Sequence, residues 1–342
     1  MKKLSPLLLA LLISIQLHAK ERLNFLIPAH PALWGVRQVY VSETSFDDSL
    51  NVDFTRRLLN NLEHVTYFNV FDDKYLEENF KEIFYIDSIS IDEKQRIACD
   101  SLGVQVILKS YVEDLSLGPD EDGSEEVMDS VWTGDYKRNK IGHIIYDNID
   151  GDSSRLKIIE EKMILKKYRY RKAQIRVKYA IHDFYTNALL MGNSIVHKYN
   201  SGKIYESEYK NLISYFDIAD SLVESITAAI VEQIAPTYRE QKRYFDEDGG
   251  LFEEAKVYAI EGLYEEAIEV LNEAEHIYPG HSSLYYNLGL IYEAVGEYEQ
   301  AASFYKKAIL MNDENRYYRK ALENIEENSD RRLKLIKKGM NP

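Results

Sequence analysis

The chain has 342 residues, and its 42 Lys and Arg against 57 Asp and Glu give a formal net charge of −15. This length allows two domains of ordinary size. A surface this acidic repels nucleic acid and anionic lipid, so we expect no nucleic-acid partner. The single cysteine, Cys99, excludes an intramolecular disulfide.

Residues 1–19 have the features of a signal peptide. Lys2 and Lys3 form a basic start, Leu7–Ile15 is a short apolar run, and residues 17–19 resemble a signal-peptidase site. The apolar run is shorter than the roughly 20 residues of a membrane-spanning helix, and no cysteine for lipid attachment follows it. We therefore expect export, to the periplasm or to a peripheral association with the outer membrane or cell wall of a Gram-negative bacterium.

Residues 20–236 are predicted to form an α/β domain, a mixed sheet with flanking helices, because the hydrophobic period changes repeatedly along the chain. We expect strands at 23–27, 36–41, 67–71 and 104–112, helices at 54–62, 74–83, 91–102 and 215–235, and a hairpin of strands at 168–184 and 189–196. Apolar residues alternate along 173–181, which is typical of a strand with one face on a core.

Residues 115–162 are predicted to be a polar, mobile insertion rich in Asp and Ser. Residues 118–129 superficially resemble a calcium loop, but the first carboxylate and the bidentate glutamate are missing, so we expect no metal. The basic cluster Lys166–Lys172 carries interleaved aromatics. Either it pairs with the acidic insertion, or it contacts anionic lipid, glycan or a partner's acidic face.

Three segments carry a resemblance to a known family. They are Tyr-Phe-Asn-Val-Phe-Asp at 67–72, Ala-Cys-Asp-Ser-Leu-Gly-Val-Gln-Val-Ile-Leu at 98–108, and Tyr-Ala-Ile-His-Asp at 179–183. With the order of elements, they make residues 21–236 weakly similar to the α/β domain of the curli-secretion lipoprotein family and of penicillin-binding-protein activators. The lipidated cysteine and a counterpart of 115–162 are absent from this chain. The resemblance implies an envelope protein that binds other proteins or forms a homo-oligomer.

Residues 237–342 are predicted to form an all-α array of helical hairpins. Residues 262–267 recur as 296–301, and this spacing of 34 residues, with Gly289, Ala301 and Ala308 at close-packing positions, resembles the tetratricopeptide repeat. We expect units at 248–281 and 282–315 and a capping helix at 316–339. Two units fall below the three that stability usually requires, so a helix near 215–244 is expected to buttress them.

The tetratricopeptide resemblance implies a concave groove that binds a protein partner. The side chains expected to line it are Phe252, Lys256, Ile260, Tyr286, Asn287, Leu290 and Glu293. The family's carboxylate clamp needs basic and Asn residues in the groove, and only Asn287 occupies its expected place. We therefore expect no binding of an acidic C-terminal peptide.

The sequence contains no Gly-x-Ser-x-Gly elbow, no phosphate-binding loop and no His-Glu-x-x-His zinc helix. We therefore expect no cofactor, no metal and no enzymatic activity. The leading hypothesis is an exported, non-enzymatic protein-interaction scaffold of the bacterial cell envelope. The alternative is a self-assembling subunit of a secretion or cell-wall-associated complex, and the third is an enzyme with an unrecognised site.

Overall fold

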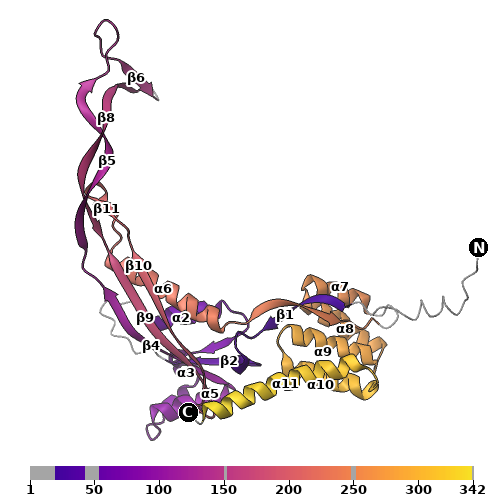
Figure 1. Ribbon diagram of the computed structural model, residues 1–342. Coiled ribbons are helices and arrows are strands. Elements are labelled where there is room, and N and C mark those ends of the chain that lie inside the picture. The colour runs from indigo at the N-terminus through magenta and orange to yellow at the C-terminus, as the bar shows by residue number, and fades with distance from the viewer. Residues whose placement is uncertain (1–19, 43–53, 150–151, 248–251, 341–342) are drawn as a thin grey trace, which may run out of the picture.

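The computed structural model describes residues 20–42, 54–149, 152–247 and 252–340. The expected signal peptide, residues 1–19, lies outside the described residues. The chain forms an α/β body, a long β-ribbon that projects from it, and a helical C-terminal part (Figure 1). This order confirms the predicted fold class.

The α/β body is built on a five-stranded mixed sheet in the order β10-β9-β4-β2-β3. Its strands are β2 (Gln38–Val41), β3 (Asn69–Phe71), β4 (Val106–Leu117), β9 (Lys172–Asp183) and β10 (Leu189–Asn200). β2 runs parallel to β3 and β4, whereas β9 runs antiparallel to β4 and β10. The predicted alternation along β9 is confirmed, since every second residue from Ala173 to Ile181 is buried.

Helices cover both faces of this sheet. Val39 and Val41 of β2 pack in the core under α2 (Phe54–Glu63) and α6 (Tyr215–Ile234). Tyr40 points to the other face and packs against the second group of helices. That group is α3 (Asp73–Asn79), α4 (Lys81–Phe84) and α5 (Ile91–Ser101). The single helix expected at 74–83 is therefore two short ones, because the backbone leaves the helical region at Phe80.

The insertion is a β-ribbon and not the mobile loop that its composition suggested. β5 (Glu121–Tyr136) pairs with β8 (Lys157–Tyr170), and the ribbon extends far from the body (Figure 1). β6 (Tyr146–Ile149) and β7 (Asp152–Arg155) pair near its tip, while β11 (Ile204–Tyr205) and the 3-10 turn η2 (Glu206–Asn211) join its base.

Opposite charges across the ribbon account for this order, because cross-strand ion pairs favour one register. The basic cluster pairs with the acidic insertion, as one of the two alternatives predicted. Arg171 Nε lies 2.6 Å from Asp120 Oδ1, and Arg169 Nε lies 2.6 Å from Asp122 Oδ1. Lys172 lies 3.1 Å from Glu121. Composition could not distinguish a loop from a ribbon here, because a solvated acidic loop and one strand of a charge-paired ribbon contain the same residue types.

The C-terminal part consists of five helices in the described residues. They are α7 (Glu253–Glu261), α8 (Tyr264–Ile277), α9 (Ser282–Ala294), α10 (Tyr298–Met311) and α11 (Arg316–Gly339). α9 and α10 pack closely at Gly289, where an added Cβ would lie 2.6 Å from Tyr305 Cδ1 and 3.1 Å from the Ala301 carbonyl oxygen. The small residue is needed here for the reason that the repeat pattern indicated.

The buttress expected at 215–244 is only partly helical. α6 ends at Ile234, and β12 (Thr237–Tyr244) pairs antiparallel with β1 (Lys20–Ile27). Leu23 and Phe25 of β1 are fully buried in the core of the helical part. The first described strand therefore packs largely with the repeats, whereas the sequence assigned it to the α/β body, in whose core only Leu26 of this strand is buried.

Two connections hold the helical part against the α/β body. The Arg37 guanidinium donates hydrogen bonds to the Tyr67 carbonyl (3.1 Å), the Val295 carbonyl (2.9 Å) and the Glu297 carboxylate (2.7 Å). α11 runs from the repeats to the sheet, passing the 3-10 turn η1 (Pro31–Leu33) and burying Ile336 in the core of the body (Figure 1). The expected capping helix, α11, therefore also connects the repeats to the α/β body.

Candidate functional site

The helical side chains predicted to line the groove come mostly from α9, and most of them are buried. Tyr286, Asn287, Leu290 and Glu293 are at most 5 % exposed. Their spacing of three and four residues places them on one face of α9. That face is covered by the segment that follows α6.

Asn287 holds this segment by its backbone. The Asp246 N–H donates to Asn287 Oδ1 (3.0 Å), and Asn287 Nδ2 donates to the Asp246 carbonyl (2.7 Å). Tyr286 donates from its hydroxyl to the Tyr244 carbonyl at 2.9 Å. Such bonds from side chains to an extended backbone are the means by which binding grooves hold peptides.

The Asp246 carboxylate accepts a hydrogen bond from the Tyr318 hydroxyl of α11 at 2.5 Å. Burial, together with this bond, raises the pKa of Tyr318 to about 12, so the hydroxyl keeps its proton and remains a donor. Residues 244–246 are thereby fixed by side chains of both α9 and α11.

Glu293 is the buried acidic residue of the groove. Its carboxylate pairs with Arg243 of β12 and accepts a hydrogen bond from Tyr305 at 2.6 Å. The Arg243 guanidinium lies over the Phe25 ring, 4.7 Å from its centroid. This pair is sheltered from solvent, so losing one partner would leave the other buried and uncompensated.

The three predicted residues near α7 differ in their surroundings. Phe252 is buried at the start of α7, and Lys256 pairs with Glu21 (3.2 Å) and Glu247 (2.9 Å). Ile260 alone among the seven predicted residues is more than a third exposed, at 41 %. The structure thus brings six of the seven residues against the protein's own chain.

Sequence reasoning missed β12 because it extended the α6 pattern past its end. The residue before a proline avoids the helical region, and Ala235, which precedes Pro236, is extended with ψ 138°. After it, Thr237 and Tyr238 favour a strand. This break was the signal that could have identified the segment.

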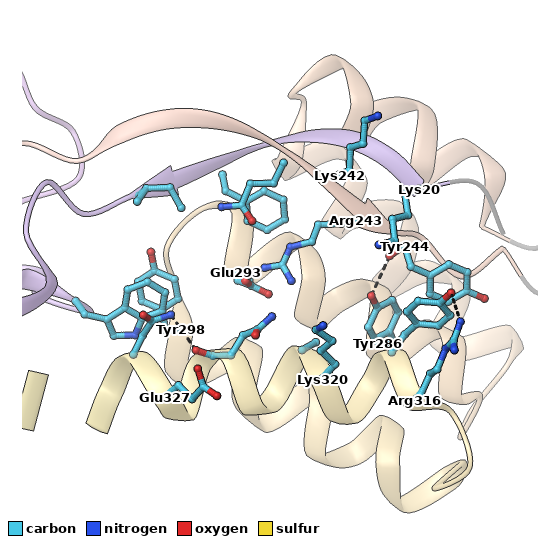
Figure 2. A pocket seen from close by; sticks show the side chains of 18 of the residues that line it. Lys20, Lys242, Arg243, Tyr244, Tyr286, Glu293, Tyr298, Arg316, Lys320 and Glu327 are labelled. Atoms are coloured by element: carbon cyan, nitrogen blue, oxygen red, sulfur yellow. Dashed lines mark hydrogen bonds and ion pairs between the residues drawn. The ribbon is translucent and has the colours of Figure 1, made fainter. Parts of the chain in front are cut away.

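A large cavity remains beside the occupied groove. It has a volume of about 870 Å³ and lies between the β1–β12 ribbon, α9 and α11 (Figure 2). Arg316 and Lys320 approach it from α11, and Tyr244 and Arg243 approach it from β12. We call it the ribbon–helix cavity.

Two searches of the described residues bear on other kinds of site. No group of three or more His, Cys, Asp or Glu side chains in the described ranges is arranged to hold a metal ion. None of the described helices combines the length and the apolar character that a bilayer crossing needs. Cys99 is buried in α5, where burial raises the pKa of its thiol to about 12.

Comparison with known proteins identifies the repeats. The tetratricopeptide repeat model matches residues 282–315, which confirms the second predicted unit. A sequence comparison with curated proteins found no match.

Solved structures with partial similarity include the PelC dodecamer from Paraburkholderia phytofirmans, with a TM-score of 0.27, 11 % identity, and coverage of 60 % of this chain and 94 % of that one. Lipoprotein GNA1162 from Neisseria meningitidis has a TM-score of 0.27 and 10 % identity, and the match covers 57 % of this chain and 99 % of that one. TM-scores this low support no argument about function.

Proposed function

We propose that the protein is an exported, non-enzymatic scaffold of the bacterial cell envelope that binds other proteins through its helical repeats and α/β body. The observation that carries this proposal is the tetratricopeptide match at 282–315 together with the tight α9–α10 packing at Gly289. Stacked helical hairpins of this kind present extended contact surfaces.

The occupied groove decides which repeat surfaces are open to a partner. Because β12 and Asp246 cover the α9 face, a partner meets the outer surfaces of α7 and α8 and the ribbon–helix cavity. Val257, Ile260 and Ile277 are apolar side chains between 41 and 69 % exposed on α7 and α8. Apolar side chains that remain exposed on repeat helices are available for contact with a partner protein.

Affinity capture tests the scaffold role. Envelope proteins would be cross-linked in cells and recovered with the full mature chain, with an Ile260→Glu variant and with a Leu310→Glu control, since Leu310 is exposed on α10, away from α7, α8 and the ribbon–helix cavity. We expect specific partners with the parent chain and a loss of at least one with Ile260→Glu alone. Failure of the parent chain to recover any reproducible partner would contradict the proposal.

Export is tested separately. The signal-peptide pattern at residues 1–19 supports export. We expect the protein in a periplasmic fraction, with the mass of a chain whose first residue is Lys20. An unprocessed chain confined to the cytoplasm would contradict this part.

The β5–β8 ribbon favours a second candidate, self-assembly in a secretion or cell-wall complex. β5 has a strand neighbour only on its β8 side among the described strands, and an isolated two-stranded ribbon is marginally stable in water. One face carries an apolar stripe between 43 and 68 % exposed, made of Met128, Trp132, Ile159, Met163 and Leu165. Open edges with apolar faces pair readily with another chain.

Light scattering during size-exclusion chromatography tests self-assembly. If the ribbon joins copies of the chain, the mature protein elutes well above its monomer mass, and Met163→Glu/Leu165→Glu returns it to the monomer. A Lys140→Glu control at the exposed tip should leave the assembly intact. A monomer at all concentrations would remove this candidate.

A further inference from the structure

The ribbon–helix cavity has a charge opposite to that of the whole protein. The chain carries a net charge of −15, yet the basic residues Lys20, Lys242, Arg243, Arg316, Lys320 and Arg331 outnumber the two acidic ones, Glu293 and Glu327, in the cavity wall. Charges elsewhere on the surface are screened within about 8 Å at physiological salt. A ligand in the cavity therefore meets a locally cationic site.

Three of these basic residues, Lys20, Arg316 and Lys320, have no acidic partner in the part of the chain that the structure describes, and we call them the rim cations. Glu293 is taken by Arg243, and Glu327 lies 3.8 Å from Arg331. Among the described residues no carboxylate lies within 4.0 Å of the side-chain nitrogens of Lys20, Arg316 or Lys320. All three side chains are exposed, and those of Arg316 and Lys320 rise from successive turns of α11 (Figure 2).

Aromatic side chains form part of the cavity wall. Tyr244 stacks on Tyr317 with ring centroids 4.4 Å apart, and Trp34 stacks on Tyr298 at 3.8 Å. Tyr286, which lines the cavity, stacks on Tyr318, which does not, with ring centroids 4.7 Å apart. Each of these stacks covers one face of each ring, and the aromatic side chains give the cavity an apolar wall beside its cations.

Amide groups complete the wall. Gln241 of β12 and Asn324 of α11 line the cavity together with the aromatic edges. An amide side chain donates to and accepts from a peptide backbone, as Asn287 does with Asp246 in the adjacent groove. Cations at the rim, amides within and an apolar wall match an extended peptide that carries carboxylates.

We propose that the ribbon–helix cavity binds an acidic, extended peptide segment of a partner protein. This inference rests on the proposed scaffold function and names the chemistry of one partner. The cavity volume of about 870 Å³ lies within the roughly 300–1,000 Å³ of ligand sites. The site differs from the carboxylate clamp expected of the repeat family, because Asn287, the one clamp residue present, is bonded to Asp246.

Fluorescence anisotropy with the full mature chain tests the site. The probe is a fluorescein-labelled peptide in which Glu alternates with Thr, and the matched probe has Gln in place of Glu. The variant is Arg316→Glu/Lys320→Glu. Its control, Arg319→Glu/Lys334→Glu, makes the same charge change at exposed α11 positions outside the cavity wall.

We expect the Glu probe to bind the parent chain and the control, and the Gln probe to bind at least about tenfold more weakly, a difference of roughly 1.4 kcal/mol. The cavity variant should lose about tenfold or more in affinity for the Glu probe. Binding should also weaken as NaCl rises from about 50 to about 500 mM, because rim charges are screened. Circular dichroism of all variants should match the parent chain.

Three results would overturn the inference. They are equal loss of binding in the cavity variant and its control, absence of binding to the parent chain, and preference for polygalacturonate, an anionic polysaccharide, over the Glu probe. Capture of partners that depends on Ile260 is measured independently. If Ile260-dependent capture persists although the peptide test fails, the scaffold proposal stands without an acidic ligand. If the parent chain captures no partner, both the scaffold proposal and the peptide proposal are removed.

Discussion

Asn287 hydrogen-bonds both backbone groups of Asp246, a residue 41 positions earlier in the chain. One amide side chain thus satisfies a buried N–H and a buried C=O at once. Because an unsatisfied buried group is costly, this relationship predicts how strongly the segment is held.

Replacing Asn287 with Ala should destabilise the protein by about 2–4 kcal/mol, since two buried backbone groups lose their partners and a small void forms. Urea denaturation followed by circular dichroism measures the change. Asn272→Ala, at an exposed position of α8, should change the free energy of unfolding by less than about 0.5 kcal/mol. Similar values for the two variants would show that Asn287 does not anchor the segment.

Gly289→Ala should destabilise the protein by about 1–3 kcal/mol, although Ala favours a helix more than Gly does. The new Cβ would lie 2.6 Å from the Tyr305 ring and 3.1 Å from the Ala301 carbonyl. In a Tyr305→Leu background the same substitution should cost less, because the ring no longer crowds it. A stabilised Gly289→Ala variant would contradict the packing described for α9 and α10.

Arg37→Ala should loosen the helical part from the α/β body. The guanidinium bonds the Val295 carbonyl and the Glu297 carboxylate across this junction, and it bonds the Tyr67 carbonyl within the body. Its loss should cost roughly 2 kcal/mol. We expect calorimetry to resolve two thermal transitions in place of one. Arg22→Ala, which removes an exposed ion pair with Glu240, should leave a single transition.

Acid should open the base of the β5–β8 ribbon. A hydrogen bond from Arg171 lowers the pKa of Asp120, and one from Arg169 lowers that of Asp122. A depressed folded-state pKa stabilises the fold above the ordinary aspartate value of 3.8, and this contribution is lost as pH falls through the folded-state value. Hydrogen exchange in the ribbon, corrected for intrinsic rates, should therefore rise below about pH 4.

Asp120→Asn should raise ribbon exchange already at neutral pH, and Glu161→Gln serves as the control, since Glu161 is exposed and has no ion pair among the described residues. Exchange that is independent of pH between about 7 and 3 would show that these ion pairs do not hold the ribbon.

The helical repeats should not fold alone. Residues 247–342 lack β1, whose Leu23 and Phe25 are buried in the repeat core, and they comprise fewer than three full repeats. We expect this fragment to melt without a cooperative transition, in contrast to the full mature chain. A cooperative fragment would show that the β1–β12 ribbon is dispensable.

The sequence predicted elements with a strong local pattern. The helix α5, the alternation along β9 and the small residue at Gly289 each depend on a few neighbouring residues. The pairing of β1 with β12 does not, because nothing in residues 20–27 indicates which distant strand completes them.

The candidate site was predicted in part for the same reason. The repeat pattern located the face of α9 correctly, but the occupant of that face comes from outside the repeats. Lys20, Arg316 and Lys320 belong to segments separated along the chain, so only the folded structure brings their charges together. An excess of acidic residues in the whole sequence also concealed this local cationic cluster.

Lys20 pairs with Tyr244 across the β1–β12 ribbon. β1, the first of the described strands, therefore remains without this partner until the chain has passed residue 244, and the repeat core that buries it must wait as well. Contacts so distant in sequence slow folding and prolong the exposure of apolar segments. Because β1 pairs with β12 and is buried by the repeats, the core of the helical part can be completed only after the segments that follow residue 244 have been made.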